Sequence, residues 1–256
     1  MVGAMEPLRI VAVGDSLSEG VGDPAPGWAG VRGELHGWVH DLSGLLEATG
    51  VPNTVTNFAL RGAVVADVES HQLGRAVALR PDVAVCFIGV NNVIRPGFDA
   101  EAFGTTYDRV IRALTAASST VVTTTVRDVA RTLPLPAGAR RRVRANAEAA
   151  NRAIRATVEA TGVLLLEADG PDDPIHAGMV SADRLHPNSL GHRFIAHRVA
   201  TLLRTAGAVP AATPLPNLDT RPASLRSRVV EDARHLAWLG AHGLTPLWRQ
   251  KADGGM

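Results

Sequence analysis

The feature that most constrains the fold of this chain is a repeated alternation of short apolar runs with longer stretches of helical spacing. The runs expected to form strands are residues 8–13, 54–58, 83–88, 120–126 and 163–167. The stretches expected to form helices, because their apolar residues recur every three or four positions, are residues 38–48, 64–79, 98–116, 139–160 and 189–203. This order predicts an α/β fold in which helices cover both faces of a five-stranded parallel sheet.

The predicted sheet also indicates where chemistry belongs. In open parallel sheets, ligands bind outside the carboxyl ends of the strands. We therefore expect functional residues in the segments that follow the first four strands and in the loop that precedes the last helix.

Composition excludes several other classes of protein. The chain has 256 residues, and 26 basic against 25 acidic side chains give a formal net charge of +1, so we expect no nucleic-acid partner. The single cysteine, Cys86, excludes an internal disulfide and a cysteine-based metal site, and its apolar run predicts a buried thiol. The nine histidines include no His-Glu-x-x-His pattern, so we expect neither a metal nor a cofactor.

The ends of the chain carry further expectations. The apolar runs fall short of the roughly 18 residues that a membrane span needs, and the N-terminus lacks a signal-peptide pattern, so we expect a cytoplasmic protein without a membrane span. Residues 1–206 contain the whole alternating pattern and are expected to form the catalytic domain. Residues 207–217 are rich in Ala and Pro and are interpreted as a linker, and residues 218–256 as a helical appendage. The oligomeric state stays open.

Ser16 is the first candidate for chemistry. It follows the first predicted strand in the segment Gly-Asp-Ser-Leu-Ser-Glu-Gly, residues 14–20. A serine at a strand end is well placed as a nucleophile if a base lies beside it. Taken alone, the same serine is equally typical of a turn or a helix cap. Residues 20–25 also fit the Gly-x-Gly-x-x-Ala pattern of dinucleotide sites, but they start late after the strand and contain Pro24.

Two further segments supply partners for a serine. Asn91 and Asn92 follow the third strand, where an amide can donate to an oxyanion, although asparagines also favour turns. Asp183 and His186 lie three residues apart before the last helix, a spacing that lets the carboxylate orient the imidazole. Together, the three segments meet the requirements for a nucleophile, a base and an orienting acid at one edge of the sheet.

These motifs resemble those of the SGNH hydrolases, also called the GDSL esterase/lipase family. The resemblance rests on Gly-Asp-Ser-Leu near the N-terminus, Asn-Phe-Ala-Leu-Arg-Gly at residues 57–62, Gly-Val-Asn-Asn at 89–92 and Asp-Arg-Leu-His-Pro-Asn at 183–188. It covers about residues 8–206 and implies a flavodoxin-like three-layer fold. The G-x-S-x-G motif of α/β-hydrolases is absent.

The resemblance also implies roles for individual residues. Ser16 would be the nucleophile, His186 the base and Asp183 the orienting acid. The oxyanion would be held by the N–H groups of Ser16 and Gly62 and by the side chain of Asn91. Asn92 stands where the family usually has Asp, which puts local hydrogen bonding of that loop in question rather than the reaction.

The function expected from these motifs is a serine-dependent acyl-ester hydrolase that acts on a small-molecule ester. Two alternatives stay open. An acyltransferase or deacylase of a biosynthetic pathway could use the same residues with another acceptor. A non-catalytic flavodoxin-like binding module would require the serine–histidine pair to be a coincidence.

Overall fold

The computed structural model of the chain describes residues 6–23, 35–169, 177–211 and 213–218. Its centre is a five-stranded sheet in the order β2-β1-β3-β4-β5, in which all neighbouring strands run parallel. The strands are β1 (Leu8–Gly14), β2 (Asn53–Asn57), β3 (Val83–Phe87), β4 (Thr120–Thr124) and β5 (Leu164–Leu166). This strand order is the flavodoxin-like one, so the predicted fold class is confirmed.

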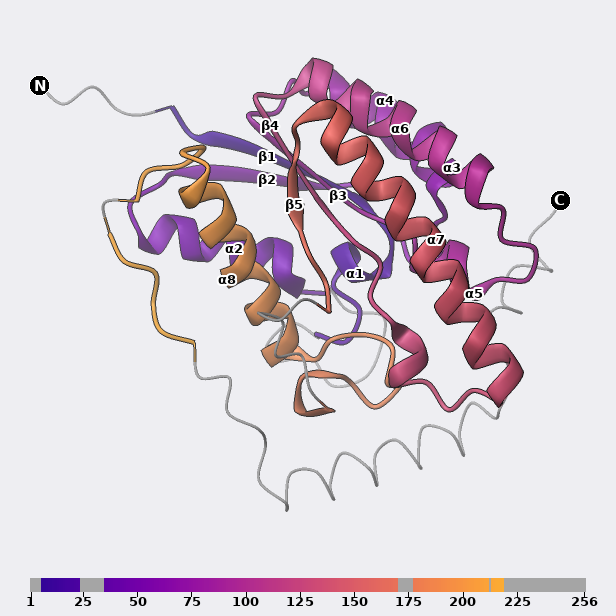
Figure 1. The fold of residues 1–256 in the computed structure, drawn as a ribbon. Helices are drawn as coiled ribbons and strands as arrows, with labels where there is room; N and C mark the ends of the chain where they lie inside the picture. The colour runs from indigo at the N-terminus through magenta and orange to yellow at the C-terminus, as the bar shows by residue number, and fades with distance from the viewer. Residues whose placement is uncertain (1–5, 24–34, 170–176, 212, 219–256) are drawn as a thin grey trace, which may run out of the picture.

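Helices cover both faces of the sheet (Figure 1). The helices are α1 (Ser16–Glu19), α2 (Gly37–Ala48), α3 (Val65–Asp67), α4 (Leu73–Ala78), α5 (Val90–Ile94), α6 (Ala100–Ala117), α7 (Ala137–Thr161) and α8 (Ser189–Thr205). Short turns of other helical types lie at Val68–Gln72, Val129–Arg131 and Ala177–Met179. Helices α2 and α8 pack together on one face, and α3, α4, α6 and α7 lie on the other (Figure 1).

The apolar character of the strands follows from this layering. Val11 and Val13 belong to the core that includes α6 and α7, whereas Ile10 and Ala12 belong to the core that includes α2 and α8. Because successive side chains of a strand point to opposite faces, a strand covered on both faces is apolar at every position. All five residues of β3 are accordingly buried.

The observed elements differ from the expected ones in three respects. Strand β3 ends one residue and β4 two residues earlier than expected, because the chain leaves the sheet and turns into loops. The helix expected at 64–79 is divided by a π-helical turn at Val68–Gln72. The short helices α1 and α5 were not predicted. Cys86 is fully buried as expected, and burial raises the pKa of its thiol to about 12.

The segment after α8 is described only in part. Val209 is buried with the residues of α2 and α8, and His197 of α8 lies 3.2 Å from the carbonyl oxygen of Pro216. The expected linker therefore lies against the domain where the structure describes it. The appendage expected at 218–256 falls outside the described residues except for its first residue, so this division of the chain stays a prediction. No helix in the described ranges is long and apolar enough to cross a membrane.

Candidate active site

Ser16 lies at the carboxyl end of β1, as the first residue of α1. The preceding residue, Asp15, caps this helix, because its carboxylate accepts a hydrogen bond from the backbone N–H of Leu17 at 3.0 Å. Gly20 ends the helix after one turn in a left-handed conformation. The turn thereby presents Ser16 to a cavity along the edge of the sheet.

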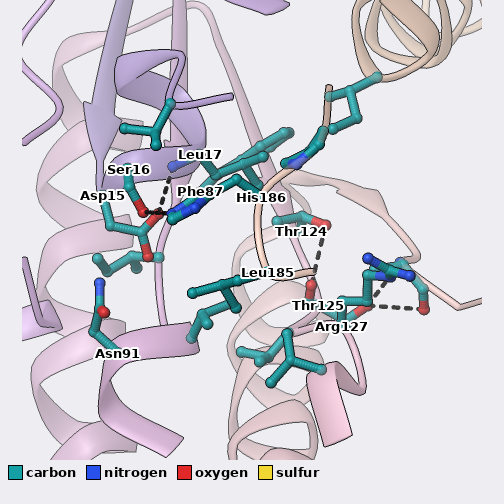
Figure 2. Close-up of a pocket in the computed structure, with 18 of the residues that line it drawn as sticks. Asp15, Ser16, Leu17, Phe87, Asn91, Thr124, Thr125, Arg127, Leu185 and His186 are labelled. Carbon is teal, nitrogen blue, oxygen red and sulfur yellow. Dashed lines mark hydrogen bonds between the residues drawn. The ribbon is translucent and has the colours of Figure 1, made fainter. Parts of the chain in front are cut away.

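His186 reaches Ser16 from the loop before α8, 170 residues further along the chain. Its Nε2 lies 2.8 Å from Ser16 Oγ (Figure 2), and its Nδ1 lies 2.5 Å from Asp183 Oδ2. The other carboxylate oxygen, Oδ1, accepts from Ser181 Oγ and from the backbone N–H groups of Leu185 and His186. The structure therefore brings the three predicted residues into one hydrogen-bonded row.

The two carboxylates near Ser16 have opposite electrostatic environments. Burial favours a higher pKa for Asp183, but the hydrogen bonds from His186 and Leu185 outweigh it and hold that pKa well below its usual range. Burial raises the pKa of Asp15 to about 6, opposed only in part by the Leu17 N–H. Asp183 is consequently the carboxylate that stays ionised beside the imidazole.

The His186 loop is held in place by its neighbours. Asn188 caps α8 by accepting from the N–H groups of Leu190 and Gly191. Gly22 lies so close to this loop that a Cβ atom there would come within 2.0 Å of the Pro187 carbonyl oxygen. Gly22, which belongs to the pattern that resembles a dinucleotide site, therefore serves close packing of two loops.

The predicted oxyanion donors come from three strand ends. Within the described residues, the N–H groups of Ser16 and Gly62 have no hydrogen-bond acceptor. Asn91 Nδ2 donates one hydrogen bond to the Ala63 carbonyl oxygen at 3.0 Å, and an amide carries a second N–H. In Figure 2 the Asn91 side chain points toward the turn of Asp15 and Ser16.

Helix α5 and the residue after it hold the Gly62 loop. Arg95 donates to the Gly62 carbonyl oxygen at 2.6 Å, and Asn92 Oδ1 accepts from the Val65 N–H at 3.1 Å. Gly62 itself has a φ of +76°, a conformation that favours glycine. Position 92, where the family usually has Asp, thus needs only an acceptor oxygen for the Val65 N–H, and Asn92 supplies one.

A cavity of about 730 Å³ extends from Ser16 and His186 past Leu185 to the ends of β4 and β5 (Figure 2). Most of its lining is apolar. The apolar lining residues include Phe87, Ile88, Val90, Ile94, Val126, Val129, Leu166, Leu185, Phe194 and Ile195. Four arginines also contribute to it, namely Arg61, Arg95, Arg127 and Arg198.

Sequence reasoning missed the role of His192 near the site. This side chain is fully buried, its Nδ1 accepts from the Trp38 N–H at 3.2 Å, and its Nε2 lies 3.0 Å from the Val21 carbonyl oxygen. Burial lowers its pKa. Its spacing of three and seven from Ile195 and Val199 marks the buried stripe of α8 and could have revealed this role. Among the described residues, no group of three or more His, Cys, Asp or Glu side chains could hold a metal ion.

Comparisons with known proteins show the family and the fold of this chain. The model of the GDSL-like Lipase/Acylhydrolase family matches residues 12–194. A similar solved structure is LAE5, an alpha/beta hydrolase enzyme from the metagenome of Lake Arreo, with 22% identity, a TM-score of 0.61 and coverage of 80% of this chain and 97% of that chain. Another is Axe2, an acetylxylan esterase from Geobacillus stearothermophilus, with 19% identity, a TM-score of 0.59 and coverage of 77% and 94%. The comparison with curated proteins found no match.

Proposed function

Since this chain belongs to the GDSL-like Lipase/Acylhydrolase family and is a carboxylic ester hydrolase, we propose that it cleaves its ester with Ser16 as nucleophile, through an acyl-enzyme. The observation that carries this proposal is the 2.8 Å contact between Ser16 Oγ and His186 Nε2, with Asp183 on the other ring nitrogen. A serine hydroxyl becomes a strong nucleophile when a neighbouring base takes its proton.

Each proton has a defined place in this mechanism. As Ser16 Oγ bonds to the ester carbonyl carbon, its proton passes to Nε2 of neutral His186, and Asp183 stabilises the resulting imidazolium. His186 then gives that proton to the alcohol oxygen as the bond between carbonyl carbon and alcohol oxygen breaks. A water molecule repeats the sequence on the acyl-enzyme, which releases the acid and restores Ser16.

The negative charge on the carbonyl oxygen requires donors as each tetrahedral intermediate forms. We assign this role to the N–H groups of Ser16 and Gly62 and to the second N–H of Asn91. Donors that are held in place before the reaction stabilise such a charge without reorganisation. The support for this assignment is that Asn91 and Arg95 hold the Gly62 loop through the carbonyl oxygens of Ala63 and Gly62.

The printed descriptions of the Axe2 structures add support. Three of them are described as catalytic mutants, in which a serine, an aspartate and a histidine are each replaced by alanine. In that protein the aspartate and the histidine lie three residues apart, as Asp183 and His186 do here.

The cavity supports a proposal about the acyl group. Its apolar lining favours burial of hydrocarbon, and each buried methylene contributes roughly 0.8 kcal/mol. We therefore expect catalytic efficiency to rise from acetyl to longer acyl esters. A panel of p-nitrophenyl acetate, butyrate, hexanoate and octanoate measures this, and equal or lower kcat/KM for the longer esters would contradict it.

The decisive experiment uses a fluorophosphonate probe, which labels activated serines. We expect one label on the wild-type protein, none on Ser16→Ala, and undiminished labelling of Ser18→Ala, a matched control because Ser18 is buried in the same helix. Peptide mapping should locate the label on Ser16. An unlabelled wild-type protein would refute the proposed mechanism and favour a binding module.

Adding an acceptor alcohol to the ester assay separates hydrolysis from acyl transfer, because a transferase yields the new ester as its main product.

A further inference from the structure

The backbone at the end of β1 lacks one of its strand partners. Alternate residues of β1 form hydrogen bonds on the β2 side. The Leu8 N–H donates to the Pro52 carbonyl oxygen, and the Ala12 carbonyl oxygen accepts from the Phe58 N–H. By this alternation, the N–H and carbonyl groups of Gly14 point toward the β2 side, where the carbonyl oxygen accepts from the Leu60 N–H at 3.1 Å. Strand β2 ends at Asn57, however, so no β2 carbonyl remains to accept from the Gly14 N–H.

A side chain from another layer supplies the missing acceptor and a second donor to the Gly14 carbonyl oxygen. Gln72 Oε1 accepts from the Gly14 N–H at 2.8 Å, and Gln72 Nε2 donates to the Gly14 carbonyl oxygen at 2.9 Å. Gln72 is only 4% exposed. Because Gly14 offers one donor and one acceptor, the orientation of the amide is fixed by chemistry.

The local shape of the helix brings Gln72 to this point. Gln72 is the last residue of the π-helical turn Val68–Gln72, which separates α3 from α4. A π turn inserts one residue into a helix and rotates the following side chains relative to the preceding ones, and such turns are frequent at functional sites. The turn lies against β1, where Gln72 meets Gly14.

We propose that Gln72 is a positioning residue that fixes the peptide from which Ser16 is presented. This inference rests on the proposed function. Gly14 has no side chain to anchor it, and none fits, because a Cβ atom would lie 2.1 Å from the Phe87 carbonyl oxygen. Ser16 follows after one residue, so a shift of the Gly14 peptide displaces both Ser16 Oγ relative to His186 and the Ser16 N–H. A misplacement of about 1 Å in a catalytic group can cost a hundredfold in rate.

The fold contains a matched control for this contact. Asn151 of α7 accepts from the Val126 N–H at 2.6 Å and donates to the Val126 carbonyl oxygen at 2.9 Å. Both amides therefore bind both polar groups of one residue at a strand end. Only the Gln72 contact lies next to the nucleophile, whereas Val126 lines the cavity at the end of β4. Loss of either contact should therefore destabilise the fold, while only loss of the Gln72 contact should lower kcat for the short ester p-nitrophenyl acetate.

Three variants test the inference with p-nitrophenyl acetate as substrate. Gln72→Met and Asn151→Leu keep the side-chain size and remove both hydrogen bonds, and the melting temperature of each variant records the structural loss. We expect Gln72→Met to lower kcat by roughly 10- to 100-fold with little change in KM, and Asn151→Leu to change kcat less than about twofold. Wild-type kcat in Gln72→Met, or equal kcat losses in both variants, would overturn the inference.

Gln72→Glu gives an independent reading, which decides alone if Gln72→Met does not fold. A protonated carboxyl group offers the same one acceptor and one donor as the amide, and burial keeps it protonated to higher pH. The ratio of variant to wild-type kcat should be near one at about pH 6.5 and should fall by about pH 9. A ratio that does not change with pH would overturn the inference. Fluorophosphonate labelling of the wild-type protein distinguishes failure of the Gln72 inference from failure of the proposed function, because an unlabelled Ser16 refutes the proposed function itself.

Discussion

The two sides of Ser16 are built in different ways. On one side, His186 and Asp183 belong to one short loop, and their contacts join side chain to side chain. On the other side, Gly62 and Asn91 come from the ends of different strands, and their contacts join side chain to backbone. Asn91 donates to the Ala63 carbonyl oxygen, and Arg95 donates to that of Gly62. The first side is therefore specified by a local spacing of three residues. The second side depends on how two distant loops pack, which is a property of the whole fold.

Asp183→Asn should have the largest effect and tests the first side alone. An amide cannot stabilise the imidazolium and can hold the ring in the wrong tautomer, so we expect kcat to fall by roughly 10⁴-fold. Steady-state kinetics with p-nitrophenyl butyrate measures this. Ser181→Ala is the matched control, because it removes only one of the donors to Asp183. A loss of less than about tenfold in Asp183→Asn would show that His186 does not depend on this carboxylate.

Asn91→Ala tests the second side. Removal of one oxyanion donor typically lowers kcat by about a hundredfold or more, and KM should change little because the donor acts mainly in the transition state. The same assay and the melting temperature of the variant give both quantities. If KM rises while kcat stays at the wild-type value, Asn91 binds the ground-state ester instead.

Asp15 lies between the two sides and gives a pH-dependent test. Because its pKa is raised to about 6, the folded protein binds this proton more tightly than the unfolded chain does. Its contribution to stability is present at low pH and is lost as pH rises toward 6. Asp15→Asn should therefore gain roughly 1–3 kcal/mol in unfolding free energy relative to wild type between about pH 4 and pH 7. Urea unfolding at the two pH values measures this gain, and an equal difference at both would contradict the prediction.

Asn92 should give the smallest effect. Its Oδ1 accepts from the Val65 N–H, an interaction that an aspartate also makes. We expect Asn92→Asp to keep wild-type kcat, and Asn92→Ala to lose only a few-fold, since it loosens the loop without removing an oxyanion donor. If Asn92→Ala is more damaging than Asn91→Ala, the assignment of the donor is wrong by one residue.

Much of the fold could be predicted, because strands buried on both faces leave long apolar runs such as residues 83–88. The meeting of Ser16 and His186 could be predicted because each stands in a distinctive local motif at the sheet edge. The contact of Gln72 with Gly14 could not be predicted, since it joins residues 58 positions apart and depends on a π turn. The two-residue shortening of β4 depends likewise on tertiary packing. Local spacing therefore specifies the reacting groups, and the tertiary fold specifies what holds them.

The 170 residues between Ser16 and His186 also have a consequence for biosynthesis. A nascent chain emerges from the ribosome with its N-terminal part first, so Ser16 is synthesised long before His186, its proposed base. Closing so long a loop is entropically costly and must wait until α8 docks against α2. Secondary structure can therefore form well before esterase activity appears. Recovery of turnover after dilution from denaturant accordingly reports the last step of assembly, the docking of the C-terminal part of the domain.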